Sequence, residues 1–289
     1  MTTARSDEVA RMLPRPLRAI VLVLLLLLVL GPVLYMLFAS VSSDLSVAAG
    51  HFLPRDLEFA NYLHIWSTTD LGQGLVNSIV VAGSVAVLCA FTSLLSAYVL
   101  VGFAFKGRLT VLRGLLALQS VPGTLMLLPV FVLFSSIGTV LGVPVIGTRW
   151  ALFLTYLTFG LPFSTWVMVT YLRGLPRELD EAARVDGASS WTVLTRIVLP
   201  LSWPGLVVSA IFAFLLGWND VLFASVLTNP GTRTAAVSLQ VFGATQEGGA
   251  VPLYGQLMAA ALVCAVPVVV LYLVFQRYLM SGLTSGGVK

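Results

Sequence analysis

Few residues in this sequence have the type and spacing needed for chemistry on a substrate. The sequence lacks the G-x-x-x-x-G-K-[ST] loop that holds nucleotide phosphates, and it lacks H-E-x-x-H and G-x-S-x-G. His51 and His64 both lie in one polar loop, and Cys89 and Cys264 each lie inside an apolar run. A solvated histidine and an inert packing cysteine are the ordinary interpretations of such positions. We therefore expect no enzymatic centre, no metal site and no cofactor bound by this chain.

The longest charged segment with a helical pattern is 178–204. Arg177 and Glu181 are four residues apart, as are Asp180 and Arg184, so each pair can form an ion pair along a helix surface. A segment of this kind suits an aqueous environment. We interpret it as a loop that is held by another protein or, alternatively, as an amphipathic loop that lies on a membrane surface.

The same segment predicts two helices separated by a turn. Gly187 can end the first helix because glycine enters the left-handed region without a steric penalty, and Ser189 or Ser190 can cap the second. The apolar face of the second helix consists of Trp191, Leu194, Ile197 and Val198. A face of small residues, which lets another protein approach the backbone closely, consists of Ala182, Ala183, Gly187 and Ala188.

The composition indicates a protein with several membrane spans. Of 289 residues, 58% are hydrophobic and only 10% are charged, and the mean hydropathy is +0.98. Soluble domains carry about 25% charged residues, so this chain has too few charges to cover a water-facing surface. Six apolar runs are long enough to cross a hydrocarbon core of about 30 Å; they are 19–40, 75–101, 115–137, 150–172, 205–227 and 253–275. The first is too long for the apolar part of a cleaved signal peptide, which has about 7–15 residues.

Lysine and arginine are distributed unevenly between the loops that join these runs. Thirteen of the 16 lie in the tail 1–18, the turn after the second run, the charged loop 173–204 or the tail 277–289. Only Arg55, Arg149 and Arg233 lie on the other side. The positive-inside rule therefore predicts cytoplasmic termini and a cytoplasmic charged loop. The same asymmetry explains the pI of about 9.3 without a nucleic-acid partner.

Inside the spans, Trp218, Asn219 and Asp220 are the candidate pathway residues. They lie in the half of the fifth run that is far from the charged loop. An ionisable residue within a span is by default a hypothesis for a transport pathway. The alternatives are a structural hydrogen-bonding role for Asp220 and a packing or anchoring role for Trp218 and Trp166.

The motif E-A-A-x-x-D-G-A, followed after eight residues by I-x-L-P, begins at Glu181 and ends at Pro200. It resembles the cytoplasmic-loop signature of ABC importer permease subunits. Other segments are similar to carbohydrate-uptake permeases of the maltose type: F-L-P at 52–54 with Asn61-Tyr62, Asn77-Ser78, V-P-G at 121–123 with Leu128-Pro129, G-W-N-D at 217–220, and the tail 276–289. The tail ends G-G-V-K where the family commonly has G-A-V-K.

The resemblance implies an all-α membrane protein with six transmembrane helices over 19–276, both termini cytoplasmic, and the maltose-type permease fold. It also implies that the loop is a coupling helix that docks on an ATPase subunit. The coupling residues would be Glu178, Asp180, Glu181, Ala182, Ala183, Asp186, Gly187 and Ala188. A second contact with the ATPase would involve Gly282, Ser285, Gly286, Gly287 and Lys289 in the tail.

The function implied by the resemblance is the import of a di- or oligosaccharide across a bacterial cell membrane, with this chain forming half of the translocation pathway. The implied partners are a second, different permease subunit, an extracytoplasmic solute-binding protein or lipoprotein, membrane lipid, and an ATPase dimer that binds ATP and Mg²⁺. One alternative is a permease for glycerol phosphate or a glycerophosphodiester. Another is an ion-driven secondary transporter, which would need ionisable residues near the bilayer midplane in addition to Asp220.

Overall fold

A computed structural model describes residues 14–176, 178–246 and 253–285. Within these residues the regular elements are helices, and the β-structure is an isolated bridge between Ser42 and Leu57. Five helices are long and apolar enough to cross a membrane, and the number is six if the bent pair Ser190–Leu201 and Trp203–Asn219 forms one span. The prediction of an all-α protein with about six apolar spans is confirmed.

The chain divides into two compact units, Met1–Thr68 with Gly243–Val263, and Thr69–Phe242 with Cys264–Lys289. The first unit contains α2 (Arg15–Ser40), α3 (Asp44–Ala48) and α4 (Asn61–Thr68). The second contains α5 (Leu71–Gly102), α6 (Arg108–Gln119), α7 (Gly123–Leu141), α8 (Arg149–Arg173), α9 (Glu178–Val185), α10 (Ser190–Val193), the π-helix η1 (Leu194–Val198), α11 (Leu199–Leu201), α12 (Trp203–Asn219) and α13 (Leu222–Leu227). Helices α14 (Ala235–Gln246) and α15 (Tyr254–Ser285) each have residues in both units.

Two predicted spans are displaced in the structure. The sequence places the third at 115–137, whereas α6 ends at Gln119 and α7 begins at Gly123, because Pro122 disfavours the helical conformation of the residue before it. The sequence places the fifth at 205–227, whereas α12 ends at Asn219. Asp220 has ψ 127, which is extended, and its side chain caps the separate helix α13.

Helices also occur where the sequence predicts loops or a tail. The predicted loop 41–73 contains α3 and α4, and the predicted loop 228–252 contains α14. The last helix does not end near Phe275 but continues to Ser285, because 276–281 contain neither glycine nor proline. Part of the predicted tail 277–289 is therefore helical.

In the first unit, the loop after α2 is organised around the buried side chain of Asn61. Its amide donates to the carbonyl oxygens of Ser40, at 3.1 Å, and Ser42, at 3.0 Å. The backbone N–H of Gly255 donates to the carboxylate of Asp44 at 2.8 Å. Burial raises the pKa of that carboxyl, and the hydrogen bond from Gly255 partly opposes the increase. These bonds satisfy backbone groups that would otherwise be buried without a partner.

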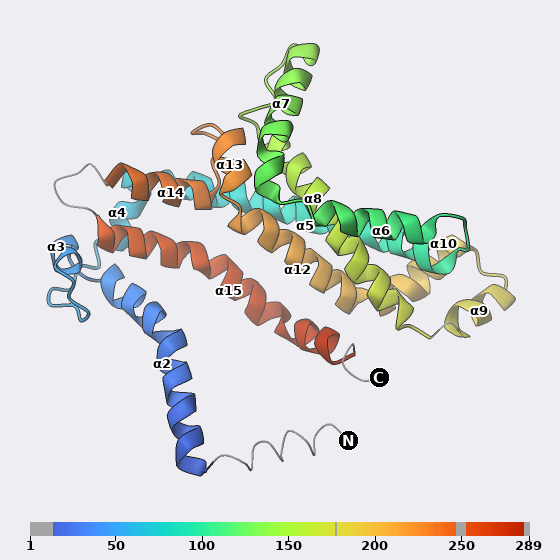
Figure 1. The fold of residues 1–289 in the computed structure, drawn as a ribbon, viewed down its shortest axis with the longest axis horizontal. Helices are drawn as coiled ribbons and strands as arrows, with labels where there is room; N and C mark the ends of the chain where they lie inside the picture. The colour runs from blue at the N-terminus through green and yellow to red at the C-terminus, as the bar shows by residue number, and fades with distance from the viewer. Residues whose placement is uncertain (1–13, 177, 247–252, 286–289) are drawn as a thin grey trace. The chain divides into compact units, whose positions relative to one another are not determined.

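The core of the second unit is formed by α5, α8 and α12, which run side by side (Figure 1). Near its start α12 meets α8 at Gly205 and the ring of Tyr171, and near its end at Gly217 and the ring of Tyr156. The two helices are therefore antiparallel. A Cβ atom added at Gly217 would lie 2.9 Å from Tyr156 Cδ2, so the absence of a side chain is what permits this approach.

Helix α5 packs against both of the other core helices. Ser93 and Ser209 join α5 to α12 by a hydrogen bond of 3.3 Å between their hydroxyls, and Ala82 lies beside Gly217. The side chain of Cys89 contacts α8 at Gly160, which explains why this cysteine is buried. Helices α5 and α8 therefore run parallel to each other and antiparallel to α12.

We predict that Gly217→Ala lowers the stability of the protein by about 1–3 kcal/mol, because the new methyl group would overlap a buried ring that cannot move freely. The check is the melting temperature of the purified protein in detergent. Gly83→Ala on α5 is the matched control, since an added Cβ there meets nothing within 4 Å. Equal melting temperatures for the two variants would contradict this account of the core.

Candidate functional site

The first helix of the charged loop ends as the sequence predicts. Gly187 follows α9 with φ +82, in the left-handed region. The N–H of Ala188 then donates to the carbonyl of Ala183 at 2.9 Å, and the N–H of Asp186 donates to that of Ala182 at 3.0 Å. The bond from Ala188 closes the kind of helix terminus that glycine favours. The carboxylate residues Glu178 and Glu181 are exposed, so the helix presents negative charge to its surroundings.

The second helix begins as predicted but buries a different face. Ser189, of the two candidate caps, accepts a hydrogen bond from the N–H of Thr192 at 3.2 Å. Leu194 is buried, as the sequence predicts, but Trp191 is 68% exposed. Val193, which is not part of the predicted apolar face, is fully buried. A π-helical turn at 194–198 follows these residues and shifts the faces of the helix after it, where Ile197 and Val198 are half-buried.

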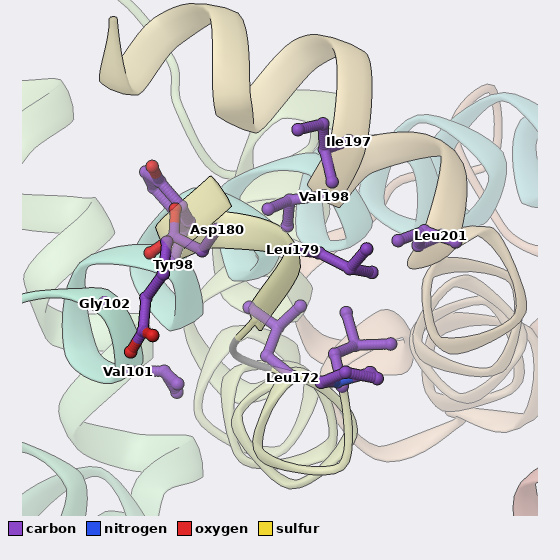
Figure 2. Close-up of a pocket in the computed structure, with 12 residues that line it drawn as sticks. Tyr98, Val101, Gly102, Leu172, Leu179, Asp180, Ile197, Val198 and Leu201 are labelled. Carbon is purple, nitrogen blue, oxygen red and sulfur yellow. The ribbon is translucent and has the colours of Figure 1, made fainter. Parts of the chain in front are cut away.

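A cavity of about 230 Å³ lies beneath α9 (Figure 2). Leu172 at the end of α8 and Tyr98 at the end of α5 form one side, and Leu179 of α9 and Val198 of η1 form another. The Tyr98 hydroxyl also donates to the carbonyl of Ser190 at 3.1 Å, which connects α5 directly to the second helix of the loop. The second helix is thus tied to the core, while α9 borders the cavity through Leu179, Asp180 and Glu181.

Parts of the predicted site lie outside the described residues or side chains. Arg177 lies outside the described residues and the side chain of Arg184 is not described, so both predicted ion pairs remain predictions. In the tail, Gly282 and Ser285 lie on α15. The other tail candidates, Gly286, Gly287 and Lys289, lie outside the described residues.

The three candidate pathway residues have different surroundings. Trp218 is buried and stacks on Phe214, with 5.3 Å between ring centroids. The carboxylate of Asp220 accepts hydrogen bonds from the Tyr156 hydroxyl, at 2.8 Å, and from the N–H of Ala224, at 2.9 Å. These contacts give Trp218 and Asp220 structural roles at the end of α12. Asn219 lies between them and is exposed.

A cluster of hydrogen-bonded polar groups at the end of the core far from the charged loop was not predicted from the sequence. The Asn77 amide is fully buried and donates to the carbonyls of Gly231, at 3.2 Å, and Arg233, at 2.8 Å. Its oxygen accepts from Arg149 Nε at 2.8 Å. The hydroxyl of Ser78 accepts from the first N–H of α14 at 2.9 Å. An Asn-Ser pair inside an apolar run is the signal that could have indicated this joint, because buried amides must find partners.

These features define a membrane protein with several apolar helices and an exposed helix–turn–helix loop between two of them. The family model described as "Binding-protein-dependent transport system inner membrane component" matches residues 90–285, which is more than half of the chain. The chain belongs to this family of transport permeases.

Several characterised relatives match nearly end to end. The trehalose/maltose transport system permease protein MalG of Thermococcus litoralis is 33% identical over 280 residues, covering 96% of this chain and 98% of the relative. The diacetylchitobiose uptake system permease protein NgcG of Streptomyces coelicolor is 32% identical and covers 92% and 86%. A solved bacterial ABC transporter that imports alginate has a similar fold, with a TM-score of 0.76 at 21% identity over 95% of this chain and 98% of that one.

We predict that Tyr156→Phe destabilises the protein, because it leaves the Asp220 carboxylate without its side-chain donor. Loss of such a bond costs about 1.5–3 kcal/mol, which a melting curve of the purified protein would detect. Tyr272→Phe is a suitable control, since that side chain is exposed on α15. If Tyr156→Phe and Tyr272→Phe both had the wild-type melting temperature, the bond from Tyr156 to Asp220 would not stabilise the end of α12.

Proposed function

We propose that this chain is a permease subunit of an ATP-driven importer of a di- or oligosaccharide, and that the loop 178–204 couples it to a separate ATPase dimer. The observation that carries the proposal is the end-to-end similarity to permeases named for trehalose, maltose and diacetylchitobiose transport. Because the sequence has no phosphate-binding loop, ATP and Mg²⁺ belong to the partner ATPase, and this chain performs no chemistry itself.

The geometry of the loop suits the transmission of movement. α9 offers an exposed acidic surface and lies over a cavity, so a partner can displace it at little cost to the core. The segment Ser190–Leu201 leads directly into α12 through a bend of 74°. Displacement of the loop therefore changes the tilt of α12, and α12 packs on α8 along most of its length. In alternating access, this is how closure of the ATPase dimer opens the pathway on the other side.

The remaining partners follow from the proposed role. A chain that forms half of a pathway needs a second, different permease subunit, and an importer of this family needs an extracytoplasmic solute-binding protein. A similar alginate transporter has been solved in complex with an alginate pentasaccharide-bound periplasmic protein, which supports this expectation. The cluster of 13 of the 16 Lys and Arg residues on one side favours cytoplasmic termini and a cytoplasmic loop. Residues 282–289 are then a second candidate contact with the ATPase.

The direct test is reconstitution of this permease with its partner permease, ATPase and solute-binding protein in proteoliposomes. We expect ATP-dependent uptake from a panel of radiolabelled trehalose, maltose and diacetylchitobiose, together with ATP hydrolysis stimulated by the sugar-loaded binding protein. Uptake of glycerol 3-phosphate alone would support the phosphate-ester alternative. Uptake by this chain without the ATPase would support a secondary transporter and contradict the proposal.

We predict that Gly187→Val lowers uptake by about tenfold or more, because a β-branched residue at φ +82 costs over about 1–2 kcal/mol and deforms the end of α9. Gly187→Asn is the matched control, since asparagine tolerates the left-handed conformation. Glu181→Lys should also abolish uptake while the chain remains inserted, because it reverses a charge on the docking surface. Normal uptake by Gly187→Val and Glu181→Lys would exclude the coupling role.

A further inference from the structure

A second cavity, of about 360 Å³, lies beside the core of the second unit and is separate from the one beneath α9. We call it the amide–aromatic cavity. It is lined mainly by Gln119 at the end of α6, by Gly160, Phe163 and Ser164 of α8, and by Phe212 and Asn219 of α12. Its volume falls within the range of about 300–1,000 Å³ that is usual for small-molecule sites.

The amide–aromatic cavity lies near the middle of a membrane span. Gly160 is 11 residues after the start of α8 at Arg149 and 13 before its end at Arg173. At 1.5 Å per residue, the cavity is roughly 17–20 Å from either end of that helix. Polar groups at this depth face a protein interior or a water-filled passage, because hydrocarbon cannot satisfy their hydrogen bonds.

Three polar side chains of the cavity lack a partner. The buried Ser164 hydroxyl has no hydrogen-bond partner among the described residues, whereas Thr155, Thr158 and Thr170 elsewhere on α8 each donate to the carbonyl four residues earlier. The side chains of Gln119 and Asn219 are exposed and make no hydrogen bond within the part of the chain that the structure describes. They can therefore donate to, and accept from, a molecule in the cavity.

The aromatic side of the cavity complements these amides. The Phe163 and Phe212 rings meet edge to face, with 5.0 Å between centroids, and Trp166 lies 5.8 Å from Phe163. Hydroxyl-rich faces of a sugar suit amides, and its apolar C–H faces suit aromatic rings. None of the described residues that line the cavity is ionisable, whereas a phosphate ester would require an arginine or lysine.

We propose that the amide–aromatic cavity is a contact site for a neutral sugar in transit, with Asn219 and Gln119 as its hydrogen-bonding groups and Phe163 and Phe212 as its stacking surface. The inference rests on the proposed transport function and adds a substrate-contacting role for this subunit. A competing occupant is an apolar helix of the second permease subunit, which would cover the cavity and exclude water from it.

The first experiment distinguishes water from protein or lipid at this site. In the complete complex, with Cys89→Ala and Cys264→Ala as background, single cysteines are introduced by Asn219→Cys, Phe212→Cys or Leu154→Cys and treated with 2-sulfonatoethyl methanethiosulfonate, a charged thiol reagent. Leu154 is the matched control: like Phe212 it is 44% exposed, but it lies on the face of α8 opposite Phe163. We expect Asn219→Cys and Phe212→Cys to react during ATP turnover and Leu154→Cys to remain unmodified.

The second experiment measures whether the sugar uses the site. Asn219→Leu and Gln119→Leu keep the size of the side chain but remove its hydrogen bonds, so uptake of the panel sugars should fall by about tenfold. ATP hydrolysis stimulated by the sugar-loaded binding protein should persist, which a variant with a damaged fold or assembly would not show.

The outcomes of the two experiments distinguish failure of this inference from failure of the proposed function. Absence of labelling at Asn219→Cys and Phe212→Cys would overturn the inference in favour of a covered helix interface. Wild-type uptake by both leucine variants would also overturn it. If the wild-type complex took up no sugar of the panel, the proposed function would fail, and this result is distinct from loss in the variants alone.

Discussion

The antiparallel packing of α12 on α8 is the constraint on which the rest of the second unit depends. Gly205 and Gly217 let the two backbones approach at both ends of α12, each against a tyrosine ring. Contact at both ends holds α12 against α8 from Gly205 to Gly217. The helix joins the charged loop to Asn219, 16 residues after Trp203. The proposed coupling and pathway roles both depend on this one element.

The polar groups of the apolar helices differ in how their hydrogen bonds are satisfied. Some are bonded within the structure, as the buried Asn77 is to loop carbonyls and the half-buried Asp220 is to Tyr156 and the start of α13. Others, Gln119 and Asn219 of the amide–aromatic cavity, are exposed and make no hydrogen bond among the described residues. Because lipid cannot satisfy such groups, the proposed sugar contact gives Gln119 and Asn219 a partner that the described residues do not supply.

The sequence supports the broad architecture better than the details of its breaks. Apolar length predicts the long helices, and glycine and serine preferences predict the end of α9 at Gly187 and the cap at Ser189, because these effects are local. The end of α12 at Asn219 was not predictable in the same way, since Asp220 breaks the helix through a partner 64 residues earlier in the chain. The cavity of Gln119 and Asn219 is also tertiary, because it combines residues from three helices that no local pattern connects.

The central claim is that α9 moves against the core when the ATPase dimer closes. Spin labels at Ala182 of α9 and Leu154 of α8, placed in the complete complex without native cysteines, would measure this movement by double electron–electron resonance. The account predicts that the distance distribution shifts between the nucleotide-free complex and the complex trapped with ATP and vanadate. An identical distribution in both states, in a complex that still transports sugar, would contradict it.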